Sequence, residues 1–231
     1  MIRLHLVVEG QTERQFAQLV LADYLAQFDV FIDARSVETS RDKKRNKIYR
    51  GGMLDYEHLK GDLVRWIKQD NYPECRFTTM VDLYRIPDNW PQYQAAMNIR
   101  DPYLRVQKLE DALGQDLGYR HFVPYVQLHE FETLLFSEPE RFEIEFIDRQ
   151  ASIEALKTIK NQTKFGGNPE LINDDPLSAP SKQIIANIPE YDSKKSAAGP
   201  KIARAIGIAR LLKDCKHFRE WVKKLASLNA V

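Results

Sequence analysis

Three acidic residues follow apolar stretches of the chain: Glu9 ends "IRLHLVVE", Asp82 ends "RFTTMVD", and Glu130 follows "HFVPYVQLH". Each of these stretches has the character of a β-strand. Ligands gather outside the carboxyl ends of strands in an open α/β sheet, so acids at these positions would converge although they are far apart in sequence. Converging carboxylates repel one another unless a cation lies among them, and their hard oxygen ligands suit Mg²⁺ or Mn²⁺. The pattern therefore indicates a metal centre.

Each acid taken alone also has a structural interpretation. Glu13 would lie in the first turn of a helix, where the helix dipole favours a negative charge. Asp82 could begin a turn into the proline-rich loop that follows. Glu9 is harder to explain structurally, because a carboxylate directly after an apolar strand is poorly placed for solvent. The combination of acids, rather than any one of them, is the functional signal.

The segment "LHEFETLLF" contributes one further acid to this set. In a strand Glu130 and Glu132 would point the same way, whereas in a helix they would diverge. The apolar residues around them favour a helix that begins near His129, so Glu130 is expected at the site, with Glu132 as the second choice. His129 lacks the HExxH spacing of a zinc protease, and a structural role is predicted for it.

Apolar periodicity predicts strands that alternate with helices. Strands are expected over 2–8, 30–37, 76–82 and 121–128, and Pro124 places the last one at an edge or a bulge. Helices are expected from Thr12, as N-cap with Gln15 three residues later, over 55–69 and over 101–116. This alternation predicts an α/β fold with a mostly parallel sheet that is flanked by helices.

The pattern becomes helical after residue 128. Helices are expected over 150–160, 180–188, 200–213 and 216–227, with Pro200 at the first helical position of the third. The chain of 231 residues is long enough for one sizeable core with an appendage. We therefore expect an α/β core over 1–140 and a helical C-terminal extension over 141–231 that packs on it.

The charges are unevenly distributed. Hydrophobic residues make up 43% and charged residues 29%, as in ordinary globular proteins, and the formal net charge is only +1. Residues 41–50 carry six basic residues and one acid, and residues 194–224 carry ten basic residues and two acids. Residues 130–148 carry seven acids and one base. This distribution suits a protein that binds phosphates with one part and cations with another, although solvated helix faces account for most such runs.

Other classes of protein are disfavoured. Cys75 and Cys215 are isolated in the sequence, so neither a disulfide framework nor a zinc site is expected. No apolar run approaches the length that crosses a membrane, and the N-terminus lacks the features of a signal peptide. These observations predict a cytoplasmic protein with no membrane partner.

Six segments, taken in order, resemble a bacterial family. They are "VVEGQTE", "TTMVDLYRIP", "PYVQLHEFETLLFS", "APSKQI", "IPEYDSKK" and "CKHFREWVKKL", and they span almost the whole chain. The family is classified as a domain of unknown function, number 4276, and looks like a Toprim relative of the overcoming-lysogenization-defect (OLD) nucleases. The resemblance implies a Toprim-like fold and a Mg²⁺- or Mn²⁺-dependent endonuclease that acts on DNA or RNA.

The resemblance also implies roles for individual residues. Glu9 matches the Toprim glutamate after the first strand, Glu13 the second acid of "EGxTE", and Asp82 the first acid of the Toprim "DxD". The sequence departs from the pattern at Tyr84, where the second acid of "DxD" is expected. The residues that could replace this ligand are Asp88, Glu130 and Glu132.

The chemistry of such a family implies a separate role for each of these residues. Glu9 and Asp82 would hold one metal that polarises the attacking water, and a second metal, shared with Glu13 or Glu130, would stabilise the leaving oxygen. A lysine would neutralise charge in the transition state. Lys182 and Lys194 are the candidates for that lysine, and a solvated surface position explains each of them equally well.

Partners follow from the same resemblance. The basic segments 41–50 and 194–224 would contact the nucleic-acid backbone without reading bases. An ABC-like ATPase partner and a role in phage defence are implied by kinship. The alternative is a non-catalytic regulatory or sensor subunit, which keeps the fold, binds an ATPase partner or a nucleotide, and has lost turnover with the altered "DxD".

Overall fold

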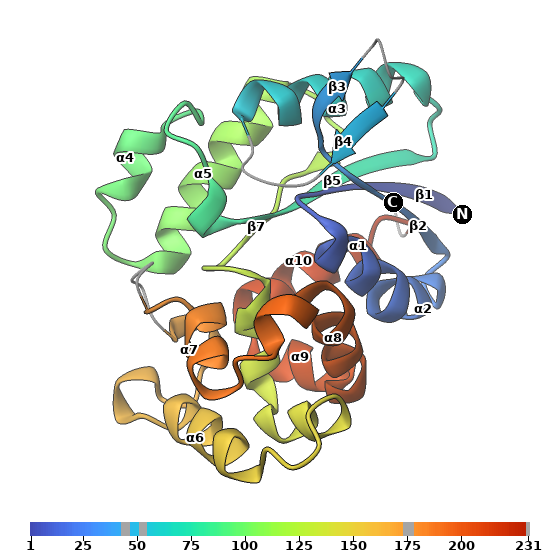
Figure 1. Ribbon diagram of the computed structural model, residues 1–231. Helices are drawn as coiled ribbons and strands as arrows, with labels where there is room; N and C mark the ends of the chain where they lie inside the picture. Colours follow the sequence, from blue (N-terminus) through green and yellow to red (C-terminus); the bar gives the residue numbers. More distant parts are fainter. Residues whose placement is uncertain (43–46, 51–54, 173–177, 230–231) are drawn as a thin grey trace.

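A parallel β-sheet forms the centre of the molecule. The computed structural model describes residues 1–42, 47–50, 55–172 and 178–229 (Figure 1). The strands lie in the order β2, β1, β5, β6, with β7 also paired to β5, and all of these pairs are parallel. Their bounds are β1 Ile2–Val8, β2 Val30–Ser36, β5 Cys75–Asp82, β6 Phe122–Val123 and β7 Val126–Gln127. The mostly parallel sheet predicted from the sequence is confirmed.

The apolar run of β1 follows from burial on both faces of this sheet. Leu4, Leu6 and Val8 pack in one core, whereas Val7 packs in the other. A separate antiparallel hairpin, β3 (Glu38–Asp42) and β4 (Lys47–Arg50), lies outside the sheet. It contains most of the basic segment 41–50, of which residues 43–46 lie outside the described residues.

Helices α3 (Tyr56–Gln69) and α5 (Pro102–Leu117) cover one face of the sheet, together with the short α4 (Tyr93–Met97) (Figure 1). Asp55 and Asp101 cap α3 and α5 by accepting backbone N–H groups of the first turn. The helices predicted over 55–69 and 101–116 are therefore confirmed, with starts set by local capping.

The first helix and the C-terminal helices lie on the other side of the sheet, with α6 and α7 packed away from the strands (Figure 1). The first helix consists of α1 (Gln11–Phe16), a π-helical stretch (Ala17–Leu21) and α2 (Ala22–Ala26). The C-terminal helices are α6 Gln150–Lys160, α7 Pro180–Asn187, α8 Tyr191–Ile206, α9 Ile208–Asp214 and α10 Lys216–Ala226. The 3₁₀ helices are η2 Leu83–Arg85, η3 Phe131–Ser137, η4 Pro139–Ile144, η5 Thr163–Phe165 and η6 Pro169–Leu171. The helical C-terminal region is confirmed.

Helix α10 ties this region to the sheet. The indole N–H of Trp221 donates to Thr78 Oγ1 of β5 at 2.9 Å, and the indole stacks on the Tyr125 ring at 4.1 Å. One hydrophobic core includes residues of β1, α1 and every helix from α6 to α10. A domain boundary at residue 140 stays a prediction. None of the described helices combines the length and the apolar character needed to cross a membrane.

The N-cap predicted at Thr12 is wrong. Helix α1 begins at Gln11 with Gly10 as its N-cap, and Glu13 Oε2 accepts the Gly10 N–H at 2.8 Å. This interaction is the backward half of a capping box, with the acid three residues after the cap. The capping box therefore lies two residues earlier than expected, at Gly10 and Glu13 instead of Thr12 and Gln15.

The segment predicted as a helix over 200–213 is helical except at Gly207, but its start and its continuity were predicted wrongly. Helix α8 begins at Tyr191, contains Pro200 in its interior, and ends before Gly207, whose φ of 82° breaks the path to α9. A Cβ added to Gly199 would lie 3.0 Å from Phe131 Cε1, so the glycine allows α8 to approach η3 closely. Tertiary packing thus outweighs the helix-breaking tendency of Pro200.

Two further elements differ from prediction near the acidic segment. The strand expected over 121–128 is divided into β6 and β7 at Pro124, the residue expected to mark a bulge. The helix expected near His129 begins at Phe131 and is a 3₁₀ helix. His129 has a φ of 60°, and its Nε2 lies 3.0 Å from the Glu170 carbonyl oxygen, which holds this uncommon backbone conformation in place.

Candidate metal centre at the carboxyl ends of the strands

Glu9 and Asp82 lie at the point where the strand order reverses. Glu9 follows β1 directly and Asp82 is the last residue of β5, and these neighbouring strands pair in parallel with Val8 opposite Met80. From β1 the sheet extends through β2 on one side and through β5 on the other. Such a switch point is where open α/β sheets bind their ligands.

The structure brings the predicted acids together around Asp82. Burial, and then the charges of Glu9, Glu13, Glu130 and Glu132, raise the pKa of Asp82 well above its usual value. All five therefore lie close enough to act electrostatically on one site. Their joint role as metal ligands stays a prediction.

Glu13 is held by the turn that follows β1. Its Oε2 atom accepts the Gly10 N–H, and burial raises the pKa of its carboxyl group. A Cβ at Gly10 would lie 3.3 Å from that same oxygen, so a larger residue would crowd the carboxylate. One oxygen of the Glu13 carboxylate thus has a structural role in the strand-to-helix turn.

Glu9 and Asp82 each retain an unsatisfied oxygen. Within the described part of the chain, Glu9 Oε2 and Asp82 Oδ1 are buried and have no hydrogen-bond partner. The other oxygen of Glu9, Oε1, forms an ion pair with Arg85 Nε at 3.7 Å. Burial, with the nearby charge of Glu13, raises the pKa of Glu9 to about 8. Two buried carboxylate oxygens without donors are a fitting donor set for a hard divalent cation.

Glu130 is the best satisfied acid of the group. It precedes η3 in an extended conformation, and its two carboxylate oxygens accept hydrogen bonds from the backbone N–H and the hydroxyl of Ser181. Ser181 lies in the first turn of α7. The carboxylate thus joins the acidic edge of the sheet to the start of α7.

Glu132 lies on η3 and faces helix α8. Its Oε1 atom accepts the hydroxyl of Tyr191 at 3.2 Å and lies 4.0 Å from Lys195 Nζ. Burial, followed by the charge of Glu130, raises the pKa of Glu132 to about 7, and Lys195 opposes the shift. The structure thus places a lysine beside the acids from the opposite side of the site.

The family model described as "Domain of unknown function (DUF4276)" matches residues 8–226. The chain belongs to this family. No curated protein matches it. Among solved structures, the chain is similar to the C-terminal region of the Xanthomonas campestris pv. campestris OLD protein in two structures, one phased with platinum and one with iodine.

The platinum-phased structure has 14% identity and a TM-score of 0.46, and the alignment covers 99% of this chain and 94% of that one. The iodine-phased structure has 13% identity and a TM-score of 0.43, with 100% and 97% covered.

The two predicted lysines have different surroundings in this DUF4276 protein. Lys182 lines a cavity of about 300 Å³ beside the acids, together with Lys195 and Arg85. Lys194 Nζ instead lies 5.8 Å from the centre of the Phe146 ring. Lys195 was missed from the sequence, because the residue of "DSKK" that faces the site is set by the rotation of α8.

Tyr84 occupies the position where the family resemblance predicts a second acid. Its backbone N–H donates to the His129 carbonyl oxygen at 3.0 Å, and its ring lies 5.3 Å from the His129 ring. The ring also lines the cavity that contains Lys182. Of the acids considered as replacements, Asp88 is exposed, whereas Glu130 and Glu132 lie beside Asp82.

The basic segment 194–224 is distributed over α8, α9 and α10. Several of its charges are paired: Lys201 with Glu145 at 3.0 Å and Arg210 with Asp214 at 2.8 Å. Lys195 is directed to the acidic site through Glu132. The excess of basic residues in the sequence therefore overstates the free positive charge on these helices.

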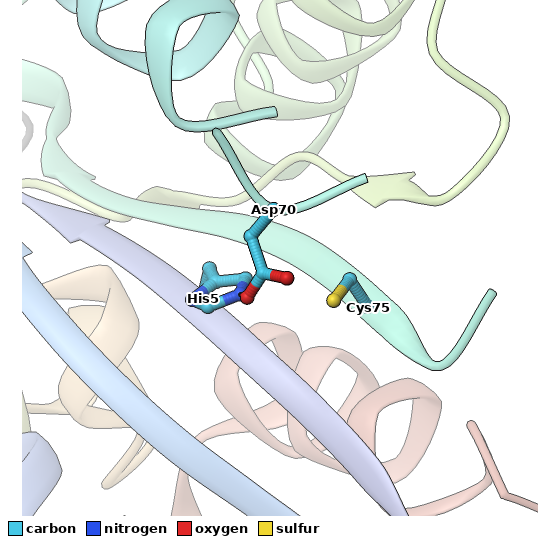
Figure 2. Close-up of side chains that lie close together, drawn as sticks. All are labelled: His5, Asp70 and Cys75. Carbon is cyan, nitrogen blue, oxygen red and sulfur yellow. Dashed lines mark hydrogen bonds and ion pairs between the residues drawn. The ribbon is translucent and has the colours of Figure 1, made fainter. Parts of the chain in front are cut away.

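A second group of potential ligands lies near the amino ends of the strands. Figure 2 shows His5, Asp70 and Cys75, whose ligand atoms lie within 4.8 Å of one another. His5 Nε2 lies 2.8 Å from Asp70 Oδ2, but the Arg3 guanidinium lies 2.9 Å from Asp70 Oδ1 and 3.2 Å from Cys75 Sγ. A cation there would have to compete with a guanidinium that already neutralises Asp70. No local sequence pattern indicates this group, because its members come together only in the folded chain.

Proposed function

We propose that this protein is a metal-dependent nuclease that hydrolyses phosphodiester bonds in DNA or RNA, with Mg²⁺ or Mn²⁺ bound between Glu9 and Asp82. The observation that carries the proposal is the pair of buried carboxylate oxygens without a donor, at the switch point of the sheet. Leaving such oxygens unpaired is costly, and a cation removes that cost. Oxygen donors without sulfur or imidazole favour Mg²⁺ or Mn²⁺ over zinc.

The acids have distinct parts in this proposal. Glu9 and Asp82 would supply the oxygens that hold the cation, and Glu13 and Glu132 would contribute to holding a second one. A cation bound there would supply an activated water and would neutralise charge on the phosphate. Without a cation, the raised pKa values of Glu9 and Asp82 keep protons on the site, so metal binding releases protons.

The cations on the opposite side bind the substrate. Arg85, Lys182 and Lys195 line the cavity next to the acids, where they would neutralise a phosphate held against the metal. Lys194, predicted for this role alongside Lys182, is the less suitable neighbour because its ammonium group lies over Phe146. The ATPase partner and the role in phage defence belong to the same proposal through the family resemblance.

One observation favours a different function. Tyr84 replaces an acid, so a non-catalytic subunit that binds nucleotide or an ATPase partner without hydrolysing anything also fits the altered pattern. Glu132 is close enough to Asp82 to raise its pKa and could supply the missing carboxylate, which favours the nuclease.

The test combines cleavage with direct metal binding. Purified protein and the Glu9→Gln and Asp82→Asn variants are incubated with labelled single-stranded and duplex substrates plus Mg²⁺ or Mn²⁺, and Mn²⁺ binding is measured by calorimetry. We expect both variants to lose cleavage by at least roughly 100-fold, since even outer-shell partners of metals cost 10–100-fold, and to lose Mn²⁺ binding. Glu154→Gln, an exposed acid on α6, is the matched control and should retain both.

Cleavage that survives in Glu9→Gln and Asp82→Asn would overturn the assignment of the site. Mn²⁺ binding that depends on Glu9 and Asp82, without cleavage of any substrate, would instead support the non-catalytic subunit. Repeating the assay in the presence of an ABC-like ATPase would show whether the protein needs such a partner in order to cleave.

A further inference from the structure

A cavity of about 300 Å³ opens beside the proposed metal centre. Its wall is formed by the residues after β5 and by the starts of α7 and α8. Two of its cations also contact the acids: Arg85 Nε lies 3.7 Å from Glu9 Oε1, and Lys195 Nζ lies 4.0 Å from Glu132 Oε1. A ligand in the cavity would therefore contact the groups that border the metal centre.

The cavity wall is positively charged. Arg85, Lys182 and Lys195 line it, and Glu130 is the acid among its lining residues. Both oxygens of Glu130 already accept hydrogen bonds from Ser181, so this carboxylate is occupied. Such a wall is suited to an anion, and guanidinium and ammonium groups together are typical of phosphate binding.

An aromatic ring lies on the same wall. Tyr84 is half-buried, and it is held in place by its backbone hydrogen bond to His129 and by the contact between the two rings. Pro87 extends the apolar part of the wall. A fixed aromatic ring next to phosphate-binding cations is the combination that binds single-stranded nucleic acid, because every base has a face that can stack.

The size of the cavity favours unpaired over paired bases as ligands. A volume of about 300 Å³ is at the lower end of pockets that enclose small ligands. A base within a duplex would have to leave its stack to enter, at a cost of a few kcal/mol, whereas an unpaired base would not. Duplex substrates are therefore disfavoured relative to single strands.

We propose that this cavity binds one unpaired nucleotide, with its base on Tyr84 and its phosphate between Arg85 and Lys195. The proposal rests on the nuclease function above and gives it a substrate class: single-stranded nucleic acid, or strands with unpaired ends. It also gives Tyr84 a role in binding substrate at the position where the family resemblance predicts a metal ligand.

Binding is measured separately from cleavage. Fluorescence anisotropy in EDTA and in Ca²⁺ compares a short single-stranded oligonucleotide with its blunt duplex. Tyr84→Ala should weaken single-strand binding roughly tenfold, within the range of stacking energies, and should change duplex binding little. Tyr84→Phe retains the ring and should bind as the wild type does. Tyr72→Ala, an exposed tyrosine near the amino ends of the strands, is the matched control.

Charge is tested in the same assay. Lys195→Gln should weaken binding of both forms, and Lys68→Gln, an exposed lysine on α3, should change neither. Thermal melting of each variant identifies any loss of folding. If Tyr84→Ala is unstable, binding by Tyr84→Phe still tests the need for an aromatic ring at this position.

The outcomes separate this inference from the nuclease function. Equal single-strand binding by the wild type and Tyr84→Ala, or an equal loss on single strands and duplexes, overturns the nucleotide cavity even where metal-dependent cleavage is found. Ring-dependent binding of single strands without cleavage supports the cavity and removes the nuclease function.

Discussion

Glu9 and Glu13 lie on the same strand-to-helix turn, yet their carboxylates are in different situations. Glu13 accepts the Gly10 N–H and so takes part in starting α1. Glu9 Oε2 is buried without a partner among the described residues. A residue that the local fold does not satisfy is the better candidate for a ligand, so Glu9 rather than Glu13 defines the site.

Stability without metal should depend on pH through Glu9. Its pKa is about 8 in the folded chain, above the ordinary value of 4.5, so the folded state holds the proton more tightly than the unfolded state. The contribution of Glu9 is present below pH 4.5 and is lost as the pH rises through about 8. We expect urea denaturation in EDTA to show a loss of stability between about pH 5 and about pH 8 that is shallower in Glu9→Gln.

Added Mn²⁺ should reverse this loss in the wild type and leave Glu9→Gln unchanged, because ligands that bind only the folded state stabilise it. Parallel pH curves for the two proteins, or equal stabilisation by Mn²⁺, would contradict the role of Glu9.

The neighbouring lysines provide a matched pair of variants. Lys195 lies 4.0 Å from Glu132 and lines the cavity, whereas Lys194 lies over Phe146. We expect Lys195→Gln to reduce cleavage about tenfold or more, since it removes a charge that faces the phosphate, and Lys194→Gln to have the smaller effect. Turnover under saturating substrate measures the difference. A larger effect at Lys194 would show that the sequence prediction chose the better lysine.

At the scale of elements, the close packing of α8 on η3 positions Glu132 and Lys195. Gly199 makes this approach possible, since an added Cβ would lie 3.0 Å from Phe131 Cε1 and 3.1 Å from the Tyr191 hydroxyl oxygen. Tyr191 in turn donates to Glu132. The glycine therefore controls the spacing between the two sides of the site.

Gly199→Ala should destabilise the protein by about 1–3 kcal/mol, the usual cost of overpacking, and should also weaken metal binding. Gly61→Ala is the control, since Gly61 lies within α3 with nothing within 4 Å of its added Cβ. That change should stabilise by up to about 1 kcal/mol, because alanine favours helix more than glycine does. Chemical denaturation measures both. Similar stability changes for the two variants would contradict the close approach at Gly199.

Elements with local signals were predictable from the sequence. Asp55 and Asp101 cap α3 and α5 from positions where the sequence alone indicates a helix start. Pro200 lies inside α8 because of packing between segments distant in sequence, and no local pattern shows this. The same holds for the site. The positions of Glu9 and Asp82 at the ends of strands could be predicted from the sequence. Only the fold reveals that Ser181 hydrogen-bonds to Glu130 and that Lys195 faces Glu132.

At the scale of the whole molecule, one core joins the sheet to the C-terminal helices. Phe16 of α1 contacts Phe218 of α10, and Tyr125 stacks between His217 and Trp221. Buried polar groups reinforce this connection. Glu170, fully buried, accepts the backbone N–H groups of His217 and Phe218 at the start of α10, and the hydroxyl of Tyr103 from α5.

Residues 1–140 should therefore not fold alone, although the predicted division of the chain falls at residue 140. Without α8 and α10, the apolar residues of α1 and of the sheet that pack against these two helices would be exposed to water, and Thr78 would lose the Trp221 indole. Losing a buried tryptophan alone costs about 3–5 kcal/mol, a large part of the 5–15 kcal/mol that stabilises a typical domain.

We expect a fragment of residues 1–140 to lack a cooperative thermal transition and to bind a hydrophobic dye. Addition of a fragment of residues 141–231 should restore both cooperative unfolding and Mn²⁺ binding. Calorimetry and dye fluorescence measure these effects. Cooperative unfolding of the first fragment by itself would show that the helical region is an independent appendage. In that case Glu132 and Lys195, on opposite sides of the division, would meet only when the two parts dock, and metal binding would depend on that docking.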